Sequence, residues 1–292
     1  MKNEANTMRI KFTQVVAVLM LAVLWGACGS GGHNASFKPT ENEKFTLADI
    51  NIKGNVSKVV VTTYAIDDPS TKAEVSTMNF DRSGRVVKQQ DKDFLNNQKS
   101  TYSFSYNRDG SIKGIKARVG DAKVVLRYNY DKRERLRECY TSNAGQETRS
   151  EIVWYDPNGW PIKIVSANEP GKYWTYNYDP SGKLLGRSSY LNDGSGTLIL
   201  NYVYSGFDGN KWTREISQDD MGNRYGSIDQ RYNSYGDLEE MNSQAKDAAI
   251  VAKVKNQYVY DVMGNWTEMT YTSSINDGTP SVIRKTREIT YK

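Results

Sequence analysis

The sequence predicts an all-β protein: a meander of about eight antiparallel β-hairpins that form one long, twisted and curved sheet. Three observations support this prediction. A short turn motif recurs along most of the chain, the composition is rich in tyrosine (20 residues), and strongly amphipathic helical patterns are lacking. A single hairpin is marginally stable in water, so repeated hairpins must bury a shared face. The pattern leaves open whether the sheet stays open or curls into a closed soluble barrel.

The repeated motif reads aromatic residue, Asp or Asn, two residues, Gly, one residue, aliphatic residue. Asp or Asn suits the first position of a type I turn, and Gly takes the left-handed conformation that closes a hairpin. Glu134 and Lys211 stand where glycine is expected, so those two turns must differ. The copies begin at Phe80, Tyr106, Tyr130, Tyr155, Tyr178, Phe207, Tyr232 and Tyr260. The predicted structural turn residues are Asp81, Gly84, Asn107, Gly110, Asp156, Gly159, Asp179, Gly182, Gly236, Asp261 and Gly264.

The segments around the repeats predict the ends of the sheet. Residues 51–66 read as an opening strand, and the last residues read as a closing hairpin with its tip at Asn276–Gly278. Pro161 follows one turn directly, which predicts an edge or an irregular strand start. Residues 243–255 predict either about two turns of helix or a loop and a strand.

The first residues predict export. Residues 1–27 combine basic residues with a short apolar run, which indicates a signal peptide rather than a membrane span. The run ends in Trp-Gly-Ala-Cys28, which resembles the lipobox of bacterial lipoproteins. This resemblance implies a lipidated Cys28, a flexible tether over residues 28–44 and a single domain over residues 45–292. It favours the outer membrane, on either its periplasmic or its surface side. An ordinary signal peptide and a start at Met8 are the alternatives.

Charge and composition exclude several classes of protein. The formal charge of +5 falls to about +3 without residues 1–27, which carry Lys2, Arg9 and Lys11 against Glu4. This balance does not favour a nucleic-acid partner. The single histidine, His33, lies in the tether, so we expect no catalytic triad, no metal site and no cofactor. Once Cys28 is lipidated, Cys139 is the remaining thiol, and we expect it to pack as a small apolar residue.

Tryptophan provides the candidate binding residues. Trp160, Trp174 and Trp154 lie within or beside the motif, and aromatic rings on a rigid sheet can stack on sugars or anchor a protein interface. The alternative is that they pack against neighbouring hairpins. Paired carboxylates could also serve a glycoside hydrolase, but acids at hairpin tips are poorly placed for a raised pKa.

The segment YNYDPSGKLL (residues 176–185) resembles the YD, or Rhs-type, repeat, and the resemblance extends over about residues 80–269. Large members of that family form a coiled β-shell around a toxic C-terminal domain; we expect no such cargo here. We therefore expect a non-enzymatic outer-membrane lipoprotein that acts as a scaffold or accessory subunit for an envelope protein complex. A surface glycan-binding lipoprotein is the alternative, and a carboxylate-based hydrolase is a weaker one. A mean hydropathy of −0.69 argues against a barrel facing lipid.

Overall fold

The computed structural model describes residues 51–133, 136–143, 146–166, 169, 171–209, 211–246 and 251–292. The predicted signal peptide, the lipidated Cys28 and the tether lie outside the described residues. Within the described part, no helix has the length and apolar character needed to cross a membrane.

The described residues form eighteen β-strands, which alternate with short turns along the whole domain. The strands are β1 (Val56–Ala65), β2 (Asp68–Phe80), β3 (Val86–Asp93), β4 (Gln98–Tyr106), β5 (Ile112–Val119), β6 (Ala122–Tyr130), β7 (Leu136–Asn143), β8 (Gln146–Tyr155), β9 (Pro161–Ser166), β10 (Lys172–Tyr178), β11 (Leu184–Leu191), β12 (Leu198–Asp208), β13 (Lys211–Gln218), β14 (Arg224–Tyr232), β15 (Leu238–Ala245), β16 (Val251–Tyr260), β17 (Trp266–Ile275) and β18 (Ser281–Tyr291).

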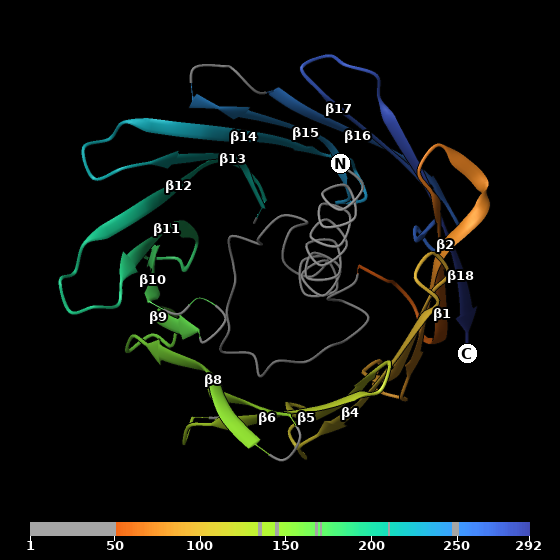
Figure 1. Ribbon diagram of the computed structural model, residues 1–292, viewed down its shortest axis with the longest axis horizontal. Helices are drawn as coiled ribbons and strands as arrows, with labels where there is room; N and C mark the ends of the chain where they lie inside the picture. The colour runs from red at the N-terminus through yellow and green to blue at the C-terminus, as the bar shows by residue number, and fades with distance from the viewer. Residues whose placement is uncertain are drawn as a thin grey trace, which may run out of the picture. The chain divides into compact units, whose positions relative to one another are not determined.

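Each strand pairs antiparallel with the next one, and β1 also pairs with β18, so the sheet closes into a barrel (Figure 1). The all-β hairpin meander predicted from the repeats is confirmed, and of the two outcomes left open the closed barrel is the correct one. Closure removes the unpaired edges that an open sheet of this length would expose to other chains. For residues 243–255 the sequence predicts either helix or a loop and a strand; residues 243–245 belong to β15 and residues 251–255 to β16.

The two ends of the barrel differ in their turns. The motif turns follow the even-numbered strands and lie at one end, together with the start of β1 and the end of β18; we call this the YD end. The turns that follow the odd-numbered strands lie at the opposite end, which we call the far end. Its described turns are residues 66–67, 94–97, 120–121, 192–197, 219–223 and 276–280.

Asp81 shows how a motif turn is built. Its Oδ1 accepts hydrogen bonds from the backbone N–H groups of Ser83 (2.8 Å) and Arg85 (3.0 Å), while the N–H of Gly84 donates to the Asp81 carbonyl (3.2 Å). Gly84 has φ +75°, a conformation that costs other residues free energy. The same backbone bond joins Asn107 to Gly110, Asp156 to Gly159, Asp179 to Gly182, Asn233 to Gly236 and Asp261 to Gly264. Every predicted turn residue therefore lies in a turn of this kind.

Two turns depart from the expected pattern. The β12–β13 hairpin, where Lys211 replaces glycine, is tighter, because Asp208 pairs directly with Lys211. The pair Asp219 and Gly222 makes the same Asp-to-Gly bond (3.2 Å) but lies at the far end. The repeat search misses this turn because Gln218, not an aromatic residue, precedes Asp219.

The tyrosines of the motif bond one hairpin to the previous one. The hydroxyl of Tyr106 donates to the carbonyl of Val86 (2.5 Å), and that of Tyr130 donates to Ile112 (2.6 Å). In the last copy it is Tyr258, two residues before the motif residue Tyr260, that donates to Leu238 (2.8 Å). In each case the acceptor is the first residue of the strand after the previous motif turn. Tyrosine therefore adds a specific polar contact to the aromatic packing, which phenylalanine could not provide.

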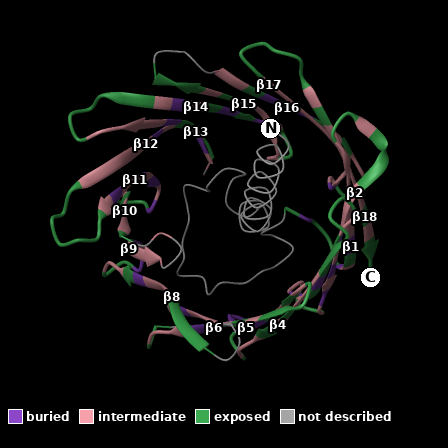
Figure 2. Ribbon diagram, viewed as in Figure 1, coloured by how far each residue is buried: buried purple, intermediate pink, exposed green. Residues whose placement is uncertain are grey.

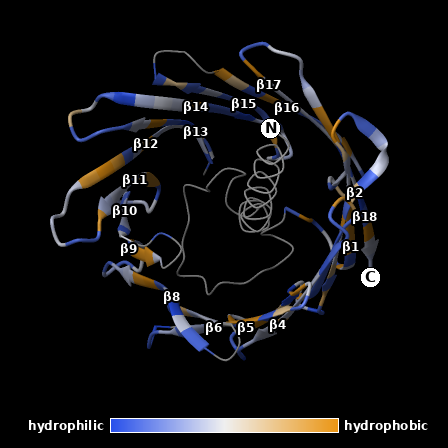
Figure 3. Cartoon of the chain, viewed as in Figure 1, coloured by the Kyte–Doolittle hydropathy of each residue, from blue (hydrophilic) through white to orange (hydrophobic). Residues whose placement is uncertain are grey.

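Alternation along the strands separates two faces of the barrel. On β16, Val254 and Asn256 are buried whereas Lys253 and Lys255 are exposed, and β3 alternates in the same way (Figure 2). Side chains converge on the concave side of a closed sheet, so we assign the less exposed set to the inner face. Hydrophilic and hydrophobic residues are interspersed along the strands (Figure 3). The best-packed core surrounds Val56 and Val59, which are fully buried near the YD end.

Candidate functional site

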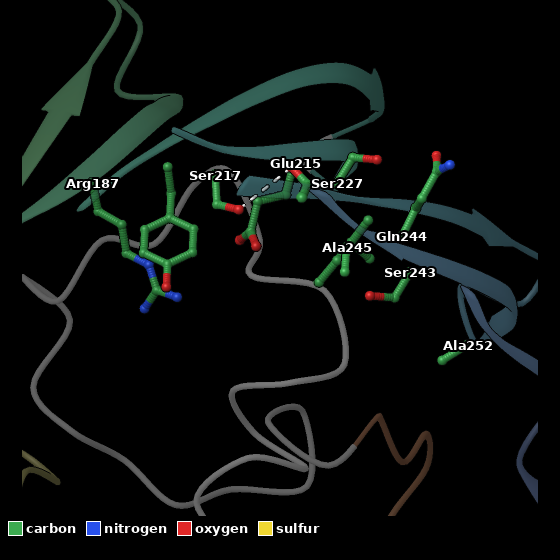
Figure 4. A pocket seen from close by; sticks show the side chains of 11 residues that line it. Arg187, Glu215, Ser217, Ser227, Ser243, Gln244, Ala245 and Ala252 are labelled. Atoms are coloured by element: carbon green, nitrogen blue, oxygen red, sulfur yellow. Dashed lines mark hydrogen bonds between the residues drawn. The ribbon is translucent and has the colours of Figure 1, made fainter. Parts of the chain in front are cut away.

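A cavity of about 390 Å³ opens on the wall formed by β11 to β16. Its volume is within the range of small-ligand sites. The side chains of Arg187 and Glu215 point to the same side of the sheet, whereas that of Gln244 points away (Figure 4). The lining residues are Arg187, Tyr202, Glu215, Ser217, Gly226, Ser227, Ile228, Ser243, Gln244, Ala245 and Ala252.

Arg187 is held in place by two aromatic rings. It lies on β11, where its backbone faces Tyr176 of β10 on one side and Tyr202 of β12 on the other. Its guanidinium carbon lies 4.9 Å from the ring centre of Trp174 and 4.7 Å from that of Tyr202. Its Nε is buried without a hydrogen-bond partner among the described residues. The rings therefore fix the orientation of the cation without supplying an acceptor.

Glu215 contributes a carboxyl group to the same cavity. It lies on β13, opposite Tyr204 of β12. Burial raises its pKa, although the positive charge of Arg187 and the nearby hydroxyl of Tyr204 act in the opposite direction. That hydroxyl does not reach the geometry of a full hydrogen bond. Of the ion pairs within 4.0 Å in the described part of the chain, none joins Arg187 to Glu215. A cation and a carboxyl group thus share one cavity without contact.

A second charged cluster lies on the inner face of β18, β2 and β3. Burial raises the pKa of Glu74, and the nearby charge of Asp91 adds to this effect. Burial also raises the pKa of Asp91, whose two carboxyl oxygens accept hydrogen bonds from Gln89 Nε2 at 3.1 and 3.2 Å. Lys285 has a pKa lowered by burial, partly offset by Glu74. Glu74 and Lys285 thus favour each other's charged form, whereas Glu74 and Asp91 disfavour it.

The three predicted stacking tryptophans do not share a surface. Trp154 is 41% exposed on the outer face, and Trp174 lies on the inner face, where Arg187 covers its ring. Trp160 lies at the YD end, half-buried against the ring of Tyr178 (5.6 Å between ring centres) and against Gly182. A ligand-stacking role for Trp160, Trp174 and Trp154 stays a prediction, and the geometry separates it into three locations.

Sequence reasoning missed Arg187 and Glu215. The stretch around Glu215 reads Thr-Arg-Glu-Ile-Ser-Gln, with polar residues at both parities of the strand. Such a pattern does not show which face is buried. The register of the strands is the one signal that could have found Glu215. Glu215 pairs with Tyr204, so its side chain lies on the same face of the sheet as Tyr202 and Tyr204.

Comparison with known proteins places this fold. The family model for the Teneurin YD-shell matches residues 39–208, more than half of the chain. The chain belongs to the Teneurin YD-shell family. This confirms the resemblance to YD repeats predicted from the motif. Teneurin-3 of Mus musculus is 28% identical over 153 residues, which cover 52% of this chain and 5% of that protein. This YD shell therefore corresponds to a small part of its curated relative.

Solved structures give weaker similarity. The Photorhabdus luminescens Tc holotoxin pore shares 14% identity, with a TM-score of 0.37, over 70% of this chain and 11% of that one. The TcdB2–TccC3 complex shares 14% identity, with a TM-score of 0.38, over 72% and 12%. A porin-like protein from Bacteroides uniformis shares 11% identity, with a TM-score of 0.44, over 80% and 97%.

The far end of this YD shell exposes large apolar side chains at two groups of turns, one at β17–β18, β1–β2 and β3–β4 and the other at β11–β12 and β13–β14. Exposed fractions reach 81% for Met221, 66% for Leu95 and 64% for Ile275. Lys92 lies over the ring of Phe94 (4.0 Å), so polar and apolar groups are mixed. We call this surface the far-end rim. It comprises Ile66, Phe94, Leu95, Leu191, Met221, Tyr225, Ile275 and Val282.

Proposed function

We propose that this YD shell is a non-enzymatic scaffold or accessory subunit of the cell envelope. In this proposal it is a lipoprotein of the outer membrane, anchored through Cys28, and it docks an envelope protein complex through the far-end rim. The observation that carries the proposal is the rim itself. Apolar side chains gathered on exposed turns, with polar groups between them, are typical of surfaces that contact another protein.

The closed sheet supports a scaffold role. A barrel whose strands are all paired holds its turns in fixed positions, and rigidly held turns are common binding elements. Leu95, Met221 and Ile275 come from three different hairpins, so one partner would contact several of them at once. Affinity in such interfaces depends on a few large side chains that become fully buried.

A glycan-binding role is the second candidate, and an aromatic group on the outer face favours it. The rings of Tyr173 and Tyr190 stack at 5.2 Å. Lys163 lies over Tyr173 (4.0 Å) and over Trp154 (5.5 Å). A row of half-exposed rings on a rigid sheet can stack against sugars. A Trp154→Ala variant that loses retention on envelope polysaccharide columns would favour this role over protein docking.

Site-specific photocrosslinking tests the docking proposal. A photoreactive amino acid is placed at Leu95 or Ile275 in the rim, and at Val262 of the YD end as a matched exposed control. In intact envelopes, the two rim positions should crosslink to the same partner protein, and position 262 should not. Equal crosslinking from both ends, or none from the rim, would contradict docking through this surface.

Cys28→Ala tests the anchor separately. The variant should fold normally but leave the membrane fraction, because the lipid chain and not the barrel holds the protein there. The measurement is fractionation of envelopes followed by immunodetection, with thermal unfolding of the purified variant as the folding control. A variant that still sediments with membranes would overturn the lipid anchor while leaving the crosslinking result to decide the docking surface.

A further inference from the structure

The guanidinium of Arg187 has no acceptor among the described residues, although it is held in a fixed orientation. Trp174 and Tyr202 enclose it, and none of the described ion pairs or hydrogen bonds includes it. Its Nε is buried without a partner among the described residues, and proteins almost always satisfy a buried N–H group. Structural arginines on the outer face differ: Arg231, for example, pairs with Glu239 and Glu240. Arg187 is therefore prepared for an acceptor that comes from outside the chain.

The cavity beside Arg187 has room for that acceptor. Its volume of about 390 Å³ accommodates a single sugar ring or a molecule of similar size. Figure 4 shows the nitrogen atoms of Arg187 directed away from the sheet, to the side where Glu215 also points. A planar guanidinium binds a carboxylate through two parallel hydrogen bonds, which a single lysine cannot do.

The remaining polar groups suit hydroxyls rather than a second charge. Ser217 lines the cavity on β13, two strands from Arg187, and offers a hydroxyl that can donate or accept. Glu215 adds a buried carboxyl, which can accept a hydrogen bond from a ligand hydroxyl. A ligand with two negative charges would place one of them near Glu215, which is unfavourable. The lining therefore matches one carboxylate attached to a hydroxyl-bearing frame.

We propose that the part of the cavity between Arg187, Glu215 and Ser217 binds a sugar acid, with its carboxylate on Arg187 and its hydroxyls on Glu215 and Ser217. The sugar acid could be free or the end unit of an acidic glycan, and both present the same chemistry. The site is separate from the far-end rim and from the outer aromatic group. It does not depend on how the protein docks or where it is anchored.

Calorimetric titration of the purified protein tests the site. The probes are galacturonate, trigalacturonate and galactose, which has the same ring without the carboxylate. Galacturonate should bind and galactose should not. Tighter binding of trigalacturonate would identify a glycan end as the source, and binding of the monomer alone would identify a free sugar acid.

Variants link binding to the named residues. Arg187→Gln should weaken galacturonate binding about tenfold or more, because a charged hydrogen-bonded pair is lost. Arg187→Lys should fall between, since it keeps the charge but loses the planar fork. Arg214→Gln is the matched control, because it also removes one positive charge. Arg214 precedes Glu215 on β13 and pairs with Asp229 at the surface. The affinity of this variant should stay within about twofold of the parent.

Ser217→Leu provides a second test that keeps every charge. Leucine fills part of the cavity beside Tyr202 and Glu215, so binding should weaken although Arg187 is intact. Thermal unfolding of each variant shows whether it folds, and Arg187→Lys and Ser217→Leu decide the matter if Arg187→Gln does not. The proposal is overturned if wild-type protein binds no acidic sugar, if galactose binds equally well, or if the folded Arg187 variants bind as the parent does.

Discussion

The sheet closes more firmly between its first and last strands than between two strands that are neighbours in sequence. β1 and β18 form seven residue pairs, from Val56 with Tyr291 to Thr63 with Lys285. β9 and β10 form only two, Trp174 with Ile164 and Thr175 with Lys163. We call these contacts the closing seam and the β9 seam. Proximity along the chain evidently does not determine how well two strands pair in this barrel.

The local residues explain the difference. At the closing seam, Val56 and Val59 are fully buried in the best-packed core of the domain. Backbone hydrogen bonds close it at both ends, from Lys292 to Asn55 (2.8 Å) and from Asp67 to Val282 (2.9 Å). Burial of branched aliphatic side chains and a long ladder stabilise the same interface.

The β9 seam is held mainly by side chains. β9 begins at Pro161, which has no N–H to donate, and has six residues. Trp160 packs against Tyr178 at the YD end of the seam, and Lys163 lies over the rings of Trp154 and Tyr173 on the outer face. The difference teaches that a barrel can replace backbone pairing locally by aromatic and cation–π contacts.

The largest effect should come from a charge in the closing seam. Val59→Asp should lower the free energy of unfolding by roughly 3–5 kcal/mol, because an unpaired carboxylate would replace a fully buried side chain. Ile162→Asp in β9, where the side chain is 41% exposed, should cost under about 1 kcal/mol. Urea unfolding followed by tryptophan fluorescence measures both values. Similar losses in the two variants would show that the seams do not differ in stability.

A smaller effect should come from the glycine beneath Trp160. Gly182 has φ +88°, and a Cβ there would lie 2.8 Å from the Trp160 ring. Gly182→Val should therefore cost roughly 2–4 kcal/mol, from backbone strain together with displacement of the ring. Gly222 is the matched control, since it has φ +83° in the same kind of turn but no atom within 4 Å of its Cβ position.

Gly222→Val should cost roughly 1–2 kcal/mol from strain alone. The difference between the two variants in urea unfolding isolates the contribution of Trp160 to the β9 seam. Equal losses would mean that Trp160 does not hold this seam. Trp160→Ala combined with Gly182→Val completes the test. If the two residues do not touch, the double variant should lose as much free energy of unfolding as the two single variants added together. A loss smaller than that sum would confirm the contact.

Much of this fold could be predicted from local chemistry, and closure could not. The aromatic, Asp and Gly positions predict hairpin tips because each acts within five residues, as the bonds around Asp81 show. Closure depends on how twist accumulates over eighteen strands, which no single repeat contains. The turn at Asp219 lacks the aromatic residue, and only the three-dimensional pairing reveals it.

The candidate site was less predictable than the fold. Trp160 directly follows a motif turn in the sequence, yet the structure shows it half-buried, because the next turn brings Gly182 against it. Arg187 lies in a strand with polar residues on both faces, so its pairing with two aromatic rings arises from strands β10 and β12. Contacts between strands are the information that a repeat pattern leaves out.

The smallest effects should have opposite signs at the two seams and should depend on pH. Beside the β9 seam, burial raises the pKa of Glu151. The contribution of Glu151 to the free energy of unfolding therefore falls as the pH rises above the pKa that this group has in the unfolded chain. Glu151→Gln should make the protein slightly more stable than the parent at pH 7, by under about 1 kcal/mol, and equally stable near pH 3.

Asp261 lies beside the closing seam and should behave in the opposite way. Burial alone would raise its pKa, but hydrogen bonds from Tyr291 and from the N–H groups of Asn265 and Met263 outweigh it, and the pKa is lowered. Its stabilisation is present above the unfolded pKa and is lost as pH falls through the folded one. Asp261→Asn should be less stable than the parent at pH 7, by under about 1 kcal/mol because the group is largely exposed. The difference should vanish at low pH. Urea unfolding of both variants at pH 7 and pH 3 measures these changes in the free energy of unfolding. If both variants change stability in the same direction at pH 7, these carboxyl groups do not distinguish the two seams.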